Sequence, residues 1–256
     1  MASDQVTPAS TRHNLLTLPQ ELRDDIYLAV LQSPCEPPPS PDEAGQRAVW
    51  GIDPLWYGGT SVFYSVNLYP RYACQSMLVC NHQMNFEVRE LLARYDTSQH
   101  GLDCKLDLMI RGAHVWPTWT LLPGPINHIR NLEVEMRIFD DYNGSQFLVD
   151  GGSGSIFRPL FHLLSDLFHH GPQFVYRGPF ERQLHVDTMQ FTIDVSKSST
   201  EDDSIQLVWL KLRMMASVEG LSSRVSELKL NTSKGVRTFL VPDKELAQKG
   251  IKTLDY

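Results

Sequence analysis

The chain has 256 residues, of which 42% are hydrophobic and 21% are charged, so it can bury a sizeable core. Its formal net charge of -7 argues against general nucleic-acid binding, which depends on basic patches. No stretch approaches the roughly 20 apolar residues of a membrane-spanning helix and no signal peptide is visible, so we expect a cytoplasmic or nuclear protein without nucleic-acid or membrane partners.

The first predicted element is a helix over residues 15–31, which follows a polar tail at 1–13 that we expect to be disordered. Thr17 and Gln20 have the spacing of a capping box, and Pro19 lies in the first turn. Apolar side chains form one stripe at every fourth residue and a second stripe beside it: Leu18, Leu22, Ile26 and Val30, then Tyr27 and Leu31. Two stripes are typical of a helix between two bodies, although a broadly buried core helix fits the pattern equally well.

A long insertion follows, over residues 33–72. Its first part, 33–46, is rich in proline, which ends the helix and favours an extended surface loop. Its second part is aromatic and contains a Tyr-Gly-Gly turn, which predicts a hairpin with Gly58 and Gly59 at the tip. We interpret the aromatic residues as a packing layer, because basic residues are nearly absent among them.

Residues 73–96 are predicted to form one long amphipathic helix. Six residues with helical spacing share its apolar face: Met77, Cys80, Met84, Val88, Leu91 and Tyr95.

Beyond residue 101 the hydrophobic period changes to two, which predicts strands separated by helices. The strands are expected at 104–110, 132–139, 184–195 (with a phase slip at 187–189), 224–230 and 236–241, and the helices at 116–122, 157–170 and 204–218. This alternation predicts an irregular, mostly parallel β/α sheet. Because the strands alternate instead of being continuously apolar, we expect one face to be open, as in leucine-rich-repeat-like proteins.

The sequence patterns for a metal site or a catalytic site are weak. Cys74, Cys80 and His82 match no zinc spacing, and the scattered cysteines fit reduced thiols. His185 and Asp187 share a strand face and could touch, but no nucleophile can be assigned to them. We therefore predict no catalytic residue, no metal and no cofactor, so a protein that is not an enzyme.

Two segments resemble a known family. Residues 15–31 contain Leu-Pro-x-Glu-Leu-Arg-x-x-Ile-Tyr, which resembles the first F-box helix of fungal F-box-like proteins. A second set of residues matches the segment that often follows it in those proteins: Leu78, Val79, Cys80, Gln83, Met84, Glu87, Leu91 and Leu92.

The resemblance implies an α+β fold, with an F-box-like helical region at 14–100, interrupted by the 33–72 insertion, and a β/α recognition region at 101–256. It implies a substrate receptor of an SCF-type cullin–RING ubiquitin ligase. The first helix would bind the Skp-type adaptor protein through Leu18, Pro19, Leu22 and Ile26. An unknown protein target would bind the polar sheet face, whose candidate contacts are Glu133, Glu135, Arg137, Glu227 and Lys229.

Two other hypotheses stay open. The first is a stand-alone interaction or scaffold protein without a ligase role, in which the first helix packs against its own C-terminal half. The second is a small-molecule-binding protein or enzyme with a pocket under the aromatic segment.

Overall fold

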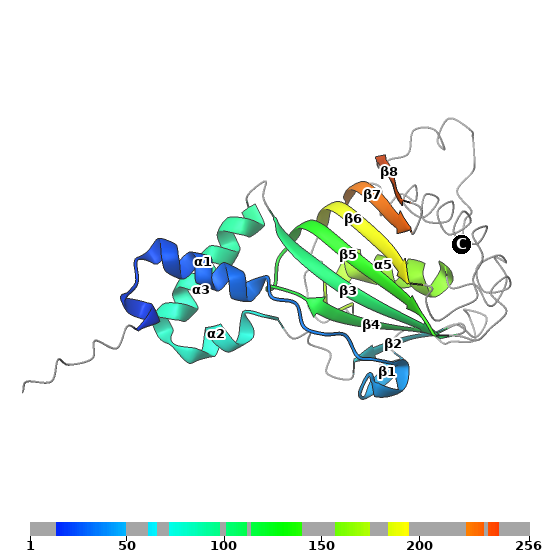
Figure 1. The fold of residues 1–256 in the computed structure, drawn as a ribbon, viewed down its shortest axis with the longest axis horizontal. Helices are drawn as coiled ribbons and strands as arrows, with labels where there is room; N and C mark the ends of the chain where they lie inside the picture. The colour runs from blue at the N-terminus through cyan, green and yellow to red at the C-terminus, as the bar shows by residue number, and fades with distance from the viewer. Residues whose placement is uncertain are drawn as a thin grey trace, which may run out of the picture.

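The computed structural model describes residues 14–49, 61–65, 72–97, 101–111, 114–139, 157–174, 184–194, 224–232 and 235–240. Within them the chain is mixed α/β, with a group of N-terminal helices at one end of an eight-stranded mixed sheet (Figure 1). The predicted tail at 1–13, the predicted helix at 204–218 and the turn at Gly58 and Gly59 lie outside the described residues. Among the helices described, none is long and apolar enough to cross a membrane.

The first helix begins differently from the prediction. A short 3-10 helix, η1 (Leu15–Thr17), precedes α1 (Gln20–Leu31), and Asn14 caps η1 by accepting a hydrogen bond from the amide of Leu16. The residue that caps α1 is Pro19, which makes no side-chain cap. The capping box predicted from Thr17 was therefore wrong, because Thr17 is part of η1 and its hydroxyl donates to the Asn14 carbonyl instead.

The predicted helix at 73–96 is two helices, α2 (Gln75–Cys80) and α3 (His82–Thr97). Asn81 separates them with an extended backbone, and its side-chain oxygen accepts a hydrogen bond of 2.8 Å from the amide of Gln83 in the first turn of α3. Asparagine is a favoured N-cap residue for this reason. The break turns Cys80 out of the predicted apolar face, and Cys80 is exposed.

The sheet has the strand order β1-β2-β4-β3-β5-β6-β7-β8. The strands are β1 (Arg47–Val49), β2 (Ser61–Ser65), β3 (Leu102–Arg111), β4 (His114–Leu121), β5 (His128–Ile138), β6 (His185–Asp194), β7 (Val225–Thr232) and β8 (Gly235–Leu240). The pairs β2–β4, β3–β5, β5–β6 and β6–β7 are parallel, and β1–β2, β3–β4 and β7–β8 are antiparallel. A solenoid stacks one repeated unit along its length, so this mixture of pairings departs from the leucine-rich-repeat-like sheet that was predicted.

Two parts of the chain belong to the sheet although they were not predicted to be part of it. The 33–72 insertion forms the antiparallel pair β1–β2, as the predicted hairpin requires, and this pair extends the sheet beyond β4. Residues 116–122, predicted to be helical, form most of β4 instead. Pro117 is tolerated because the pairing of β2 with β4 covers only His114 and Val115, so no ladder bond from the nitrogen of Pro117 is needed on that side.

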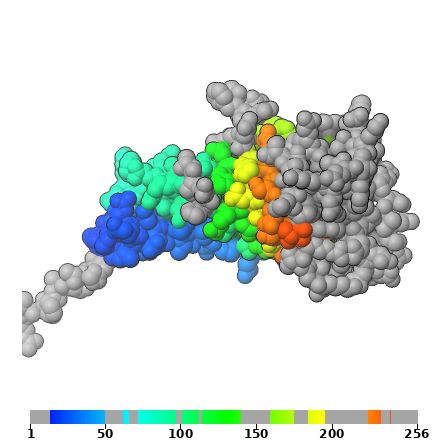
Figure 2. Space-filling view, turned by 90° about the horizontal axis from the view of Figure 1, so that it is seen from above, coloured from blue at the N-terminus to red at the C-terminus, as the bar shows by residue number. Residues whose placement is uncertain are grey.

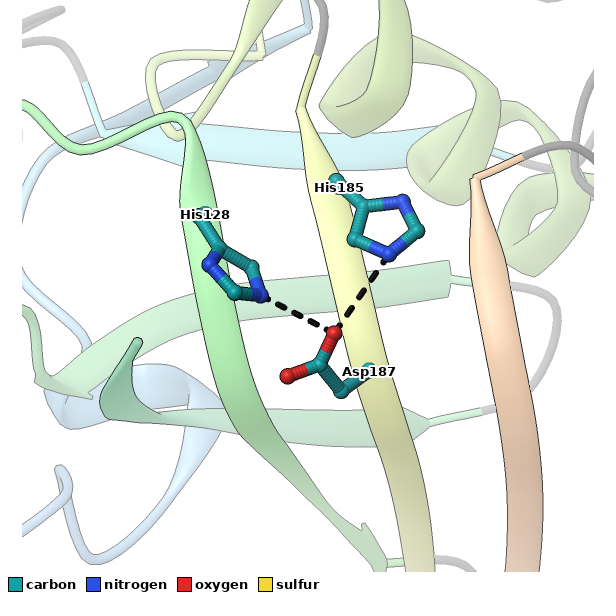
Figure 3. A group of neighbouring side chains, drawn as sticks. All are labelled: His128, His185 and Asp187. Atoms are coloured by element: carbon teal, nitrogen blue, oxygen red, sulfur yellow. Dashed lines mark hydrogen bonds and ion pairs between the residues drawn. The ribbon is translucent and has the colours of Figure 1, made fainter. Parts of the chain in front are cut away.

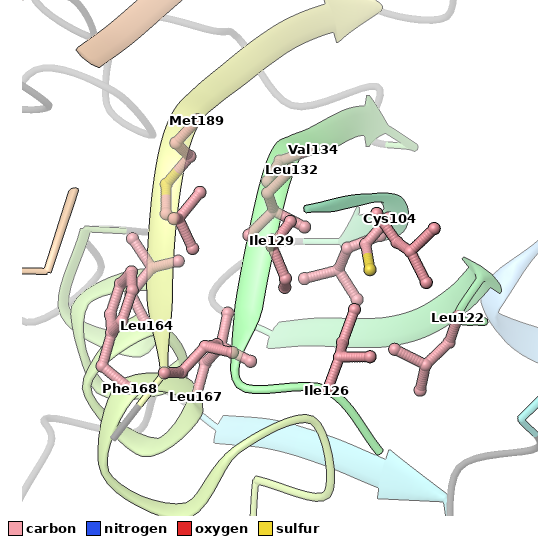
Figure 4. Packing of buried hydrophobic residues seen from close by; sticks show 14 of the residues in the cluster. Cys104, Leu122, Ile126, Ile129, Leu132, Val134, Leu164, Leu167, Phe168 and Met189 are labelled. Carbon is pink, nitrogen blue, oxygen red and sulfur yellow. The ribbon is translucent and has the colours of Figure 1, made fainter. Parts of the chain in front are cut away.

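The main core lies between the sheet and α5 (Phe157–His170) (Figure 4). Leu164, Leu167 and Phe168 of α5 are buried in one cluster with Ile129 of β5 and Met189 of β6. The predicted phase slip in β6 is present, since Val186 and Met189 are both buried with two less buried residues between them.

The opposite face of the sheet is partly covered by residues 33–46, which we call the proline strap (Figure 1). Its anchors are a hydrogen bond of 2.7 Å from the amide of Cys35 to the Thr120 carbonyl and a paired contact of 2.9 Å from Arg111 to Asp42. The 3-10 helix η2 (Pro41–Glu43) within the strap lies against β3. The face predicted to be open is therefore open only in part.

Candidate functional site

A buried polar network joins α1 to α3 and connects the two segments that carry the family resemblance. Glu87 accepts hydrogen bonds from Arg23 Nε (3.0 Å) and Nη2 (2.6 Å), from the Tyr27 hydroxyl (3.0 Å) and from Gln83 Nε2 (2.8 Å). The side chains of Arg23 and Glu87 are only 10% and 7% exposed. Arg23 also donates to the carbonyl of Leu18, which fixes the start of α1.

The network changes the acid–base properties of its members. The Arg23 guanidinium, helped by Gln83 and Tyr27, lowers the pKa of Glu87 from 4.5 to about 2 although burial opposes this shift. Burial and the adjacent Glu87 carboxylate raise the pKa of Tyr27 above its usual value. Glu87 therefore stays ionised and Tyr27 stays protonated at neutral pH, which keeps the network intact.

This network decides which of the two predicted stripes of α1 is buried. Tyr27 and Leu31 are 1% and 0% exposed, whereas Leu22, Ile26 and Val30 are 50%, 39% and 47% exposed. We call the exposed stripe the α1 ridge (Leu22, Ile26 and Val30). Figure 2 shows α1 at the surface of the projection that the helices form at one end of the molecule.

The four predicted adaptor-binding residues are all at least partly accessible. Leu22 and Ile26 belong to the α1 ridge, Pro19 is exposed and Leu18 is half-buried. Two further apolar side chains on these helices are exposed as well, Val79 on α2 and Phe86 on α3. The helical end thus carries most of the large exposed apolar side chains among the described residues.

The five residues predicted to contact a protein target lie on the strap-covered face of the sheet or at its margin, and four of them are engaged in ion pairs. Glu133 pairs with Lys105 at 2.6 Å, and Glu227 pairs with Lys229 at 2.6 Å. Glu135 is exposed. Target binding by these residues stays a prediction.

Arg137, the fifth of these residues, has a different environment. Its guanidinium donates to both carboxylate oxygens of Asp107 (2.5 and 2.8 Å) and to the carbonyl of Pro38 in the proline strap (2.7 Å). Asp107 is 1% exposed, and burial raises its pKa although Arg137 opposes this shift. Arg137 therefore connects the strap to the sheet.

A second group of polar side chains lies at the start of β5 and β6 (Figure 3). His185 and Asp187, which the sequence allowed to touch, are 3.4 Å apart between Nε2 and Oδ1. His128 of β5, which the sequence did not single out, contacts the same oxygen of Asp187 at 2.9 Å. We call these three residues the histidine cluster. By contrast, Cys74 is buried, whereas Cys80, which the sequence placed on an apolar helix face, is exposed.

No protein-family model, no curated protein and no solved structure matches this chain.

Proposed function

We propose that this protein is an interaction module that binds a Skp-type adaptor protein through α1, as a substrate receptor of an SCF-type ubiquitin ligase. The observation that carries the proposal is the α1 ridge, an apolar stripe left exposed on a helix that is already held in place by its buried side. Amphipathic helices commonly bind partner proteins by inserting such a stripe into a hydrophobic groove.

The buried network supports the proposal because it lowers the cost of binding. Arg23, Tyr27 and Glu87 fix α1 against α3, so little conformational entropy is lost when the ridge meets a partner. The same residues belong to the two segments that resemble fungal F-box-like proteins. In this proposal those segments have two roles: the network holds the helices together, and the ridge contacts the adaptor.

The small size of the α1 ridge limits its contribution to the free energy of binding. Fully burying an exposed apolar side chain of this type contributes about 1.5–3 kcal/mol. Because Leu22, Ile26 and Val30 are about half exposed, their burial would contribute about 2–4 kcal/mol in total. Micromolar affinity needs about 8 kcal/mol, so the proposed interface must extend beyond the ridge, to Leu18 and Pro19.

The test is a titration of the full chain with purified Skp-type adaptor, followed by calorimetry. Replacing Ile26 with lysine (Ile26→Lys) should weaken binding at least about tenfold, because it removes an apolar contact and adds a charge to the interface. The matched control is Val49→Lys, since Val49 is 40% exposed on β1, outside the helices. The control should bind as the wild type does.

Thermal unfolding of each variant separates binding from folding. We expect Ile26→Lys and the double variant Leu18→Ala/Pro19→Ala to stay folded and to lose adaptor binding. Failure of the wild-type chain to bind the adaptor at micromolar concentrations would refute the ligase proposal and favour a stand-alone interaction module. Equal loss of binding in Val49→Lys would show that α1 is not the contact.

A further inference from the structure

We propose that the histidine cluster is a binding site for a divalent transition-metal ion of the Zn²⁺ class. Two imidazoles and one carboxylate converge there: one ligand atom from each of His128, His185 and Asp187 lies within 4.8 Å of the other two (Figure 3). Imidazole ligands suit Zn²⁺, Ni²⁺ and Cu²⁺, whereas Mg²⁺ and Ca²⁺ prefer oxygen ligands throughout. The proposal concerns the isolated chain and does not depend on adaptor binding.

The two distances between the carboxylate and the imidazoles are compatible with one ion. Ligand bonds of 2.0–2.2 Å in a tetrahedral site separate the ligand atoms by about 3.3–3.6 Å. Oδ1 of Asp187 is 2.9 Å from Nε2 of His128 and 3.4 Å from Nε2 of His185, close to that separation. The His185 side chain is 46% exposed, so it has room for the small rotation that would bring its ring nitrogen closer to that of His128.

The backbone holds the cluster before any ion binds. His128 and His185 are register partners in the parallel pair β5–β6, and Asp187 lies two residues beyond His185 on the same strand. Asp96, near the end of α3, accepts a hydrogen bond of 3.0 Å from the amide of His128. The amide of His185 donates to the Asn127 carbonyl at 2.8 Å. Such support of the residues behind a site lowers the cost of binding.

The charge of the site also favours a cation. An imidazole that binds a metal ion is neutral, so a ligand set of two imidazoles and one carboxylate would carry a net charge of -1. Arg130, two residues beyond His128 on β5, has its positive charge offset by Asp103, with Nη2 and Oδ2 2.5 Å apart. Three protein ligands leave one tetrahedral position open for water, as in sites that are not purely structural.

The test is a titration of the full chain with Zn²⁺ against a chromophoric chelator. Because Cys35 and Cys80 are exposed and could bind zinc themselves, the background for all measurements is the double variant Cys35→Ser/Cys80→Ser. We expect one Zn²⁺ per chain, a thermal unfolding temperature that rises with Zn²⁺, and no displacement by excess Mg²⁺.

Two variants of the cluster should weaken binding, His185→Ala and Asp187→Asn, each by at least about tenfold. Both side chains are partly exposed, so the fold should persist, which the circular dichroism spectrum checks. The matched control is His82→Ala, an exposed histidine at the start of α3, which should bind Zn²⁺ normally. The proposal fails if the background chain does not bind one Zn²⁺ at a chain concentration of about 100 µM, or if the cluster variants bind as tightly as the control.

Discussion

Replacing Glu87 with alanine (Glu87→Ala) should destabilise the helical end of the protein strongly. Glu87 accepts four hydrogen bonds, two of them from Arg23. Its removal leaves the Arg23 guanidinium, only 10% exposed, without its counter-charge and with the Leu18 carbonyl as its remaining acceptor. Removing one partner of a buried ion pair typically costs 3–5 kcal/mol. We expect a cost of about 3 kcal/mol, the lower end of that range, because both side chains keep some exposed area.

Urea denaturation followed by circular dichroism measures this cost. The matched control is Asp24→Ala, which breaks the contact of 2.6 Å between Asp24 on α1 and Arg94 on α3. The Arg94 side chain is 57% exposed, so this loss should stay below about 1 kcal/mol. Both pairs link the same two helices, so the comparison sets a buried carboxylate with four hydrogen bonds against a carboxylate in a more exposed pair.

A double variant tests whether an unpaired buried charge is the cause of the lost stability. If the cost of Glu87→Ala comes from an unpaired buried charge, replacing both partners with apolar residues of similar volume (Arg23→Met with Glu87→Leu) should recover most of the stability. A free energy of unfolding for Glu87→Ala within about 1 kcal/mol of the wild type would refute the assignment of this pair as the main link between α1 and α3.

Three further predictions concern pH, the strap and close packing. The pKa of Glu87 is about 2 in the folded state against its usual 4.5, so its contribution to the free energy of unfolding is complete above pH 4.5 and is lost as the pH falls towards 2. Solvent screening reduces the maximum contribution of about 3 kcal/mol to about 1–2 kcal/mol. Unfolding measured as a function of pH would contradict this if Glu87→Gln were as acid-sensitive as the wild type. Arg137→Ala should lower the free energy of unfolding by about 3 kcal/mol, because it leaves the buried Asp107 without its ion-pair partner. It should also speed proteolytic cleavage within the proline strap, because the hydrogen bond to the Pro38 carbonyl is lost. The control Arg130→Ala breaks an exposed pair and should have neither effect. Gly101→Ala should lower stability by about 1–3 kcal/mol, since a Cβ there would lie 2.7 Å from the backbone nitrogen of Arg130; an unchanged denaturation midpoint would show that the strand can move aside.

Much of the secondary structure could be read from local periodicity. The apolar period of α5 predicted this helix over its observed range, 157–170. The alternating residues of β5 predicted a strand at 132–139, whereas the observed strand is His128–Ile138, so its first four residues were missed. Prediction failed at Asn81, which ends one helix and caps the next, and at β4, most of which was predicted to be helical. In both places the deciding interaction is made with a neighbouring element or a cap, so the hydrophobic period alone does not reveal it.

The sequence contains one signal for the histidine cluster, which is a spacing shared by the starts of three strands. β5 begins with His-Ile-x-x-Leu, at His128, and β6 begins with His-Val-x-x-Met, at His185. β7 repeats the same spacing with Val225 and Leu228, and the three strands pair in this register. Aligning these starts as neighbouring parallel strands would have set the two histidines side by side.

The sequence by itself determined that α1 has two apolar stripes, because a period of 3.6 residues is a property of the local chain. Only the tertiary structure decided which stripe is buried, since that choice depends on Glu87, 64 residues beyond Arg23. The same holds for His128, which meets Asp187 across 59 residues of chain. A local pattern fixes which side chains share a face, whereas packing between distant segments fixes what that face contacts.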